Sequence, residues 1–136
     1  MRARIAAITM LAFLLGVAPV ATRGDATPAR QWAVSWLSTP TLVGGTIVQG
    51  PVMFVHDEDA MQRGEPCTRV YLFEPGIGPT EQVTAFHCIP INRKAPRKFT
   101  MTTRANTEIG YGCVLIEYQF AGDSTAHGVP VWDLAD

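Results

Sequence analysis

The segment between the first two cysteines restricts the fold more than any other part of the chain. It reads CTRVYLFEPGIGPTEQVTAFHC from Cys67 to Cys88, two runs of alternating apolar and polar residues around a centre rich in Pro and Gly. Alternation with a period of two is typical of a β-strand with one buried face, and Pro and Gly are turn residues. The segment therefore predicts a β-hairpin with a cysteine at each end.

A disulfide between these cysteines follows from the expected register of the hairpin. With residues 75–80 as the loop, Val70 lies opposite Ala85 and Cys67 lies opposite Cys88. Directly opposed residues have Cβ atoms about 4.5–5.5 Å apart, which is close to what a disulfide needs. We therefore predict a Cys67–Cys88 bond. It would stabilise the fold by roughly 3 kcal/mol, because it closes a loop of about 22 residues.

The third cysteine leaves a second pairing open. Cys113 lies near the start of the apolar segment GCVLIEYQF, residues 112–120, whose strand could lie beside the hairpin, so a Cys88–Cys113 bond is the alternative. If Cys67 and Cys88 pair, Cys113 is the odd thiol, either buried or joining two chains in a disulfide-linked dimer. Persistent disulfides are a feature of oxidising compartments.

The N-terminus has the layout of a secretory signal peptide. Arg2 and Arg4 precede an apolar run over residues 5–20, and small residues lead up to Ala26. The run has at most sixteen residues, fewer than the about twenty that a helix needs to cross a bilayer. We expect residues 1–26 to be removed, with Ala21 as an alternative cleavage point. The protein would then be secreted or periplasmic and would not span the membrane.

Residues 27–136 predict a single β-rich domain. Six or seven short strand-like runs are separated by turn residues, which is typical of a small antiparallel β-sandwich or barrel-like domain. One short helical turn is expected at residues 57–64, with Asp57 as its N-cap and Gly64 at its end. Residues 89–97 are expected to form a basic link, and residues 121–136 a loop-like tail.

The charges of the chain argue against nucleic acid as a partner and indicate one surface that could bind an anionic partner. Residues 27–136 carry eight Lys or Arg and eleven Asp or Glu, a net charge of −3, which argues against nucleic-acid binding. Positive charge gathers in one loop around Pro96, at Arg93, Lys94, Arg97 and Lys98. This loop is a candidate surface for an anionic envelope component or a protein partner.

A metal site is the main alternative function. The imidazole and thiol donors are His56, Cys67, His87, Cys88, Cys113 and His127. Their spacing contains no C-x2-C or H-x3-H pair, although such donors suit copper or zinc. Neighbouring strand residues point to opposite faces, so His87 and Cys88 could share a metal only if the strand breaks there. The candidate ligands on this hypothesis are His56, His87 and Cys113.

No arrangement of residues predicts catalysis. Ser124 and His127 lie three residues apart in one segment, without an evident orienting acid or oxyanion hole, and a polar turn is expected there. The sequence thus favours a non-enzymatic binding or structural module of the cell envelope, without a cofactor. Its binding surface would combine exposed aromatic residues such as Trp32, Trp36 and Tyr71 with the basic loop.

Overall fold

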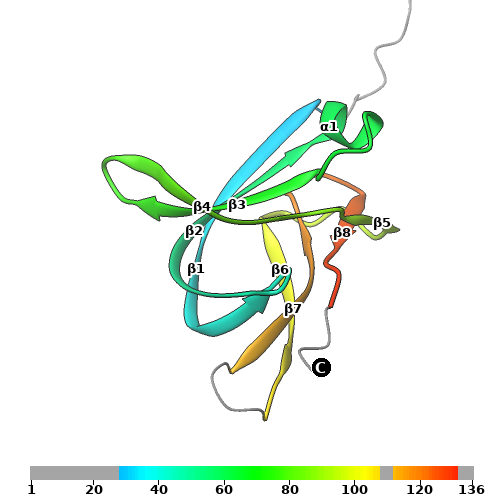
Figure 1. Cartoon of the computed structure of the whole chain (residues 1–136). Coiled ribbons are helices and arrows are strands. Elements are labelled where there is room, and N and C mark those ends of the chain that lie inside the picture. Colours follow the sequence, from blue (N-terminus) through cyan, green and yellow to red (C-terminus); the bar gives the residue numbers. More distant parts are fainter. Residues whose placement is uncertain (1–27, 108–111, 132–136) are drawn as a thin grey trace, which may run out of the picture.

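The computed structural model describes residues 28–107 and 112–131, and in these residues eight strands form one sheet (Figure 1). The predicted all-β class is confirmed. The elements are β1 (Arg30–Val43), β2 (Thr46–Asp57), α1 (Glu58–Gln62), β3 (Thr68–Glu74), β4 (Gly78–Phe86), β5 (Ile89–Asn92), β6 (Thr100–Ala105), β7 (Cys113–Gln119) and β8 (Thr125–Gly128). The predicted signal peptide lies outside the described residues. No helix in the described ranges is long and apolar enough to cross a membrane.

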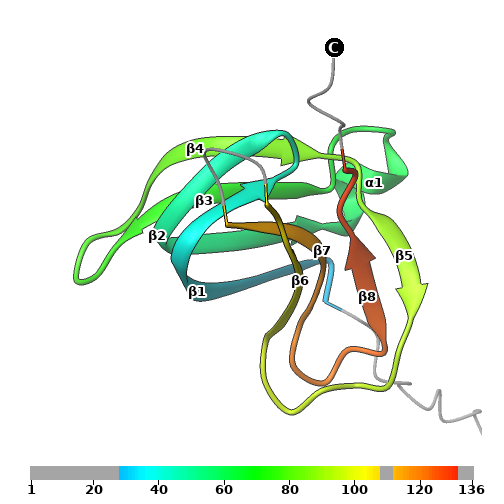
Figure 2. The same ribbon diagram turned by 90° about the horizontal axis from the view of Figure 1, so that it is seen from below.

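The sheet curls into a barrel-like shape. Its strand order is β4-β3-β2-β1-β7-β8-β5, with β6 paired to β7, and every pairing except β1 with β7 is antiparallel. The two ends of this order, β4 and β5, are separated in the chain by only His87 and Cys88. The ends of the sheet therefore approach each other, with β1–β4 on one side and β5 and β8 on the other (Figures 1 and 2).

An irregularity in β1 joins the two sides. The pairing of β1 with β2 is continuous from Arg30 to Leu37 and resumes at Thr41, with a register shift between Leu37 and Thr41. Pro40 lies in this gap, and a proline has no N–H to donate to a ladder. Beyond the shift, Thr41 and Leu42 pair in parallel with the start of β7. The chain thus contributes one strand to both halves of the sheet.

The inner face of the sheet holds the core. Along β2, Val52 and Phe54 are fully buried, and Val70 on β3 and Leu115 and Tyr118 on β7 are equally inaccessible. Alternation puts Val52 and Phe54 on one face of β2, and Val70 lies opposite Phe54 in the ladder. Leu115 and Tyr118 are three residues apart and share a face because the β6–β7 register shifts between Thr102 and Thr103. Phe99 and Phe120 complete an aromatic cluster with Phe54 and Tyr118. Burying this face is the main stabilising contribution of the β-strands.

The short helix begins as the sequence predicts. The Asp57 side chain accepts a hydrogen bond from the Ala60 amide at 3.1 Å, so Asp57 is the N-cap of α1. The turn after the helix ends at Gly64, whose φ of 74° is in the left-handed region that favours glycine. This helix lies between β2 and the hairpin that begins near Cys67.

The predicted register of the hairpin is wrong, by one residue near Val70 and by three at the turn. Val70 pairs with Thr84 instead of Ala85, and two further shifts bring Glu74 opposite Gly78. The reason is the turn: the Ile77 amide donates to the Glu74 carbonyl at 3.0 Å, so the chain reverses over Pro75 and Gly76. Pro followed by Gly with positive φ is typical of a type II turn, which is tighter than the loop expected over residues 75–80.

The disulfide forms although the register differs. Cys67 and Cys88 are bonded, with their Cα atoms 6.1 Å apart. The β3–β4 ladder ends at Thr68 and Phe86, and the chain leaves strand geometry at residues 87–88 before β5. Cys88 can therefore turn inward and become buried while His87 stays exposed. In the described part of the chain, Cys113 is the free cysteine.

Two segments predicted as a link and a tail contain strands. Residues 89–92 form β5 and residues 125–128 form β8, and these two strands pair with each other. β8 also pairs with β7 through Glu117 and Tyr118. Both strands have only four residues, and their partners are distant in sequence, so no local pattern marks them. The expected polar turn occurs just before β8, where Gly122 has a φ of 75°.

Candidate functional site

An apolar outer face covers one side of β1, β2 and β3. The alternation that buries Val52 and Phe54 turns Met53 and Val55 outward, and the register brings Val55 beside Trp32 and Met53 beside Tyr71. Trp32 is 65% exposed. A sheet that is apolar on both faces normally packs against something on each side. The outer face is not covered by any of the described residues.

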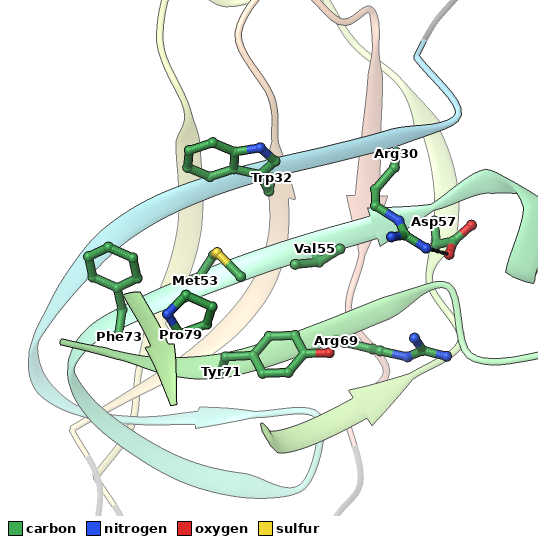
Figure 3. Close-up of a pocket in the computed structure, with 9 residues that line it drawn as sticks. All are labelled: Arg30, Trp32, Met53, Val55, Asp57, Arg69, Tyr71, Phe73 and Pro79. Atoms are coloured by element: carbon green, nitrogen blue, oxygen red, sulfur yellow. Dashed lines mark hydrogen bonds and ion pairs between the residues drawn. The ribbon is translucent and has the colours of Figure 1, made fainter. Parts of the chain in front are cut away.

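A groove runs along this face and has a volume of about 560 Å³. Side chains from four strands line it (Figure 3): Arg30, Trp32, Met53, Val55, Asp57, Arg69, Tyr71, Phe73 and Pro79. Its size is within the range of about 300–1,000 Å³ found for small-molecule sites. Figure 3 shows Phe73 and Pro79 toward one end and the charged residues toward the other.

The charged end of the groove contains one ion pair and one further cation. The Arg30 guanidinium donates to the Asp57 carboxylate at 2.9 Å. The hydrogen bond from the Ala60 amide, together with Arg30, lowers the pKa of Asp57. Arg69 forms no ion pair with any described residue and lies on the same face, next to Val55. An anionic group could therefore bind at this end without displacing a partner of Arg69.

The basic loop is exposed and separate from the groove. Arg93, Lys94, Arg97 and Lys98 lie between β5 and β6, and all four are solvent-exposed. Arg93 pairs with Glu117 at 3.3 Å, and the Lys94 carbonyl accepts from the Gln119 side chain. These contacts tie one end of the loop to β7. No side chain of this loop lines the groove.

A second constellation is buried at the junction of β2, β8 and the end of the hairpin. One ligand-type atom from each of His56, Cys88 and His127 lies within 4.8 Å of the other two. The Cys88 sulfur is 3.7 Å from His56 Nδ1, and the two imidazole rings have centroids 4.1 Å apart. Next to them is a pocket of about 290 Å³ lined by His56, Glu58, Met61, Pro90, Asp123, Thr125 and His127.

The polar partners of the two histidines differ. His56 Nε2 is 3.0 Å from the Glu58 carboxylate, whereas neither ring nitrogen of the buried His127 has a hydrogen-bond partner among the described residues. Asp123 Oδ1 accepts a hydrogen bond from the Thr125 amide. Asp123 Oδ2 has no hydrogen-bond partner within the described part of the chain and lies 4.0 Å from His127 Nε2. Burial and the neighbouring His56 lower the pKa of His127 to about 4, against the opposing effect of Asp123. His127 is therefore neutral near pH 7.

The donors predicted for a metal are distributed differently in the structure. His56 belongs to the buried cluster, but His87 is exposed and Cys113 is half-buried at the start of β7, paired with Thr41 and Ala105. Neither His87 nor Cys113 is part of the cluster. His127 takes part because β8 carries it into the core, and the sequence contains no spacing that would have indicated this.

Comparison with known proteins does not place the chain in a family. The chain matches no protein-family model, no curated protein and no solved structure.

Proposed function

We propose that this protein is a non-enzymatic binding module whose ligand is an apolar molecule carrying an acidic group. The groove on the outer face is the observation that supports this function. Its aromatic and aliphatic walls would bury the apolar part of the ligand. Arg69 at its charged end would bind the acid.

The residue types in the groove are those that contribute most to binding. Trp, Tyr and Arg dominate the energetics of binding surfaces, because large aromatic side chains bury much area and arginine binds carboxylates in a planar fork. Trp32 and Tyr71 flank the groove from β1 and β3, while Met53 forms part of its floor on β2. A rigid sheet holds these groups in place, which lowers the entropic cost of binding.

The predicted export of the chain agrees with this proposal. A signal peptide over residues 1–26 and a disulfide both fit a protein that meets its ligand outside the cytoplasm. Envelope lipids and their breakdown products include apolar chains with acidic ends. The proposed ligand class is therefore an anionic amphiphile of the cell envelope.

The test compares two ligands that differ only in the acidic group. Dodecanoate and dodecanol, both below their aggregation limits, are titrated into the full chain while binding is followed by displacement of a fluorescent anilinonaphthalene sulfonate. We expect the acid to bind about tenfold more tightly or better, since a hydrogen bond to a charged group contributes about 1.5–3 kcal/mol. Arg69→Gln should remove most of this preference, and Trp32→Ala should weaken both ligands.

Two control variants separate the groove from other surfaces. Trp36→Ala removes an aromatic side chain that is equally exposed on the same strand but does not line the groove, and it should bind as the wild type does. Replacing Arg93, Lys94, Arg97 and Lys98 by Ser should also leave the affinity unchanged. A loss of binding in the basic-loop variant with no change in Arg69→Gln would contradict the proposal and would favour the basic loop as the binding surface.

A further inference from the structure

We infer that His56, Cys88 and His127 form a zinc-type metal site that becomes available when the Cys67–Cys88 disulfide is reduced. The proposal is independent of the groove, because none of these residues lines it. It gives the Cys88 sulfur two alternative bonds, one to Cys67 and one to a metal ion.

The positions of the three donors support this assignment. A tetrahedral ion with bonds of about 2.0–2.3 Å needs ligand atoms roughly 3.3–3.8 Å apart. His56 Nδ1 and the Cys88 sulfur are already 3.7 Å apart, and all three donor atoms lie within 4.8 Å of one another. Small side-chain rotations would bring the third donor into range. Two imidazoles and one thiolate are a donor set that suits zinc.

Glu58 prepares His56 for such a role. A hydrogen bond from His56 Nε2–H to the Glu58 carboxylate, at 3.0 Å, fixes the tautomer in which the Nδ1 lone pair is free. That lone pair is directed toward Cys88, at the distance given above. Metal-bound histidines in proteins are usually held by a carboxylate or carbonyl in this way.

The environment of His127 also favours a metal ion at this cluster. It is 3% exposed, and both of its ring nitrogens lack a hydrogen-bond partner among the described residues. Buried polar groups are nearly always paired, so such an imidazole calls for a reason. Asp123 Oδ2, 4.0 Å away and also unpaired, could complete a fourth position. A metal ion would satisfy both groups together.

The neighbouring pocket offers an entry path. It has a volume of about 290 Å³ and is lined by both histidines, Glu58 and Asp123. It is large enough to hold an ion with water molecules. An ion could thus reach the cluster without opening the core.

The redox step balances with a dithiol as the reductant. Two electrons and two protons from the dithiol convert the Cys67–Cys88 disulfide to two thiols, and the dithiol becomes a disulfide. Cys88 then loses its proton to solvent when the ion binds, because thiolate is the ligand form. The neutral imidazoles bind without losing a proton. Cys67 remains a free thiol.

The experiment frees Cys88 without a reductant. Cys113→Ala is used as the background, so that no other thiol can bind, and Cys67→Ala is added to leave Cys88 as the single cysteine. Zinc affinity is measured by competition with a chromophoric chelator on the untagged full chain. We expect zinc to bind this double variant at least about 100-fold more tightly than the disulfide-bonded background. Residues that only support a metal ligand contribute about 10- to 100-fold to metal affinity, and a direct ligand such as Cys88 should contribute no less.

Matched variants test each donor. In the same double variant, His127→Ala should abolish the tight binding, and Glu58→Gln should weaken it about 10- to 100-fold. His87→Ala removes the exposed histidine next to Cys88 and should change nothing. Cobalt should give a sulfur-to-metal charge-transfer band with Cys88 present and none in Cys88→Ala. Equal zinc affinity with and without a free Cys88 would overturn the inference.

Folding is monitored by circular dichroism, because loss of the disulfide removes stability. If the double variant is unfolded, we expect zinc to restore its β-sheet spectrum, and His127→Ala to prevent this. An unfolded variant that zinc does not refold would also overturn the inference. In that case His56 and His127, whose rings are tilted against each other, are only part of the core.

Discussion

At the scale of single residues, buried polar contacts connect the inner faces of the sheet. The Tyr118 hydroxyl forms a hydrogen bond with the Thr68 hydroxyl, and both side chains are fully buried. Burial raises the pKa of Tyr118, an effect only partly offset by Thr68, so the phenol stays protonated. The bond joins β3 to β7 across the core, two strands that do not pair with each other.

Tyr118→Phe should therefore lower the free energy of unfolding by about 1–3 kcal/mol, because it leaves the buried Thr68 hydroxyl without a partner. Urea unfolding measures this change. Adding Thr68→Val should recover part of the loss, since both partners are then apolar. Tyr71→Phe is the matched control: Tyr71 lines the outer groove and is not part of the core, so the stability of this variant should stay within about 0.5 kcal/mol of the wild type. Equal losses at the two tyrosines would contradict this account.

The N-cap of α1 predicts a dependence of stability on pH. The hydrogen bond from Ala60 and the ion pair with Arg30 lower the pKa of Asp57 in the folded chain below its ordinary value of 3.8. Its stabilising contribution is thus complete above about pH 4 and is lost as the pH falls through the folded pKa. Asp57→Asn should be less stable than the wild type at pH 6, and the difference should shrink below pH 4. Thermal unfolding at several pH values checks this, and a difference that grows toward low pH would contradict it.

At the scale of elements, the sequence predicts the strands, caps and turns that depend only on residues close together in the chain. The two strands of the hairpin, the cap at Asp57 and the disulfide between the flanking cysteines all depend on short segments, and the structure confirms them. The register failed because it depends on a turn conformation, in which Gly76 adopts a φ of 83°. β8 was missed because its four residues gain their hydrogen bonds from β5 and β7, which lie far away in sequence.

The hairpin disulfide predicts one reactive thiol per chain. Alkylation after denaturation without reductant should modify Cys113 alone, and the digest should contain a Cys67–Cys88 peptide. Reduction should lower the stability by about 3 kcal/mol and the melting temperature by roughly 10–25 °C. Mass spectrometry and thermal unfolding measure the two effects. Three alkylated thiols, or a Cys88–Cys113 peptide, would contradict the pairing.

At the scale of the whole molecule, the curled sheet creates two separate chemical environments. Neighbouring residues on one strand point to opposite faces, so Phe54 lies in the core and Met53 lines the groove. The outer groove followed in part from the sequence, which marked Trp32 and Tyr71 as exposed aromatics. The buried cluster did not, because curling brings together His56, Cys88 and His127 from three distant segments, and no spacing rule encodes such a contact.

The position of a bound ligand on the sheet decides whether the outer groove is the binding site. Backbone amide shifts of the isotope-labelled full chain are recorded by nuclear magnetic resonance during a titration with dodecanoate. We predict that the perturbed amides cluster on β1, β2 and β3 around Trp32, Met53 and Arg69. In Arg69→Gln, at the same ligand concentration, they should return to their free positions. Perturbations confined to residues 93–98, or none at saturating ligand, would contradict this prediction.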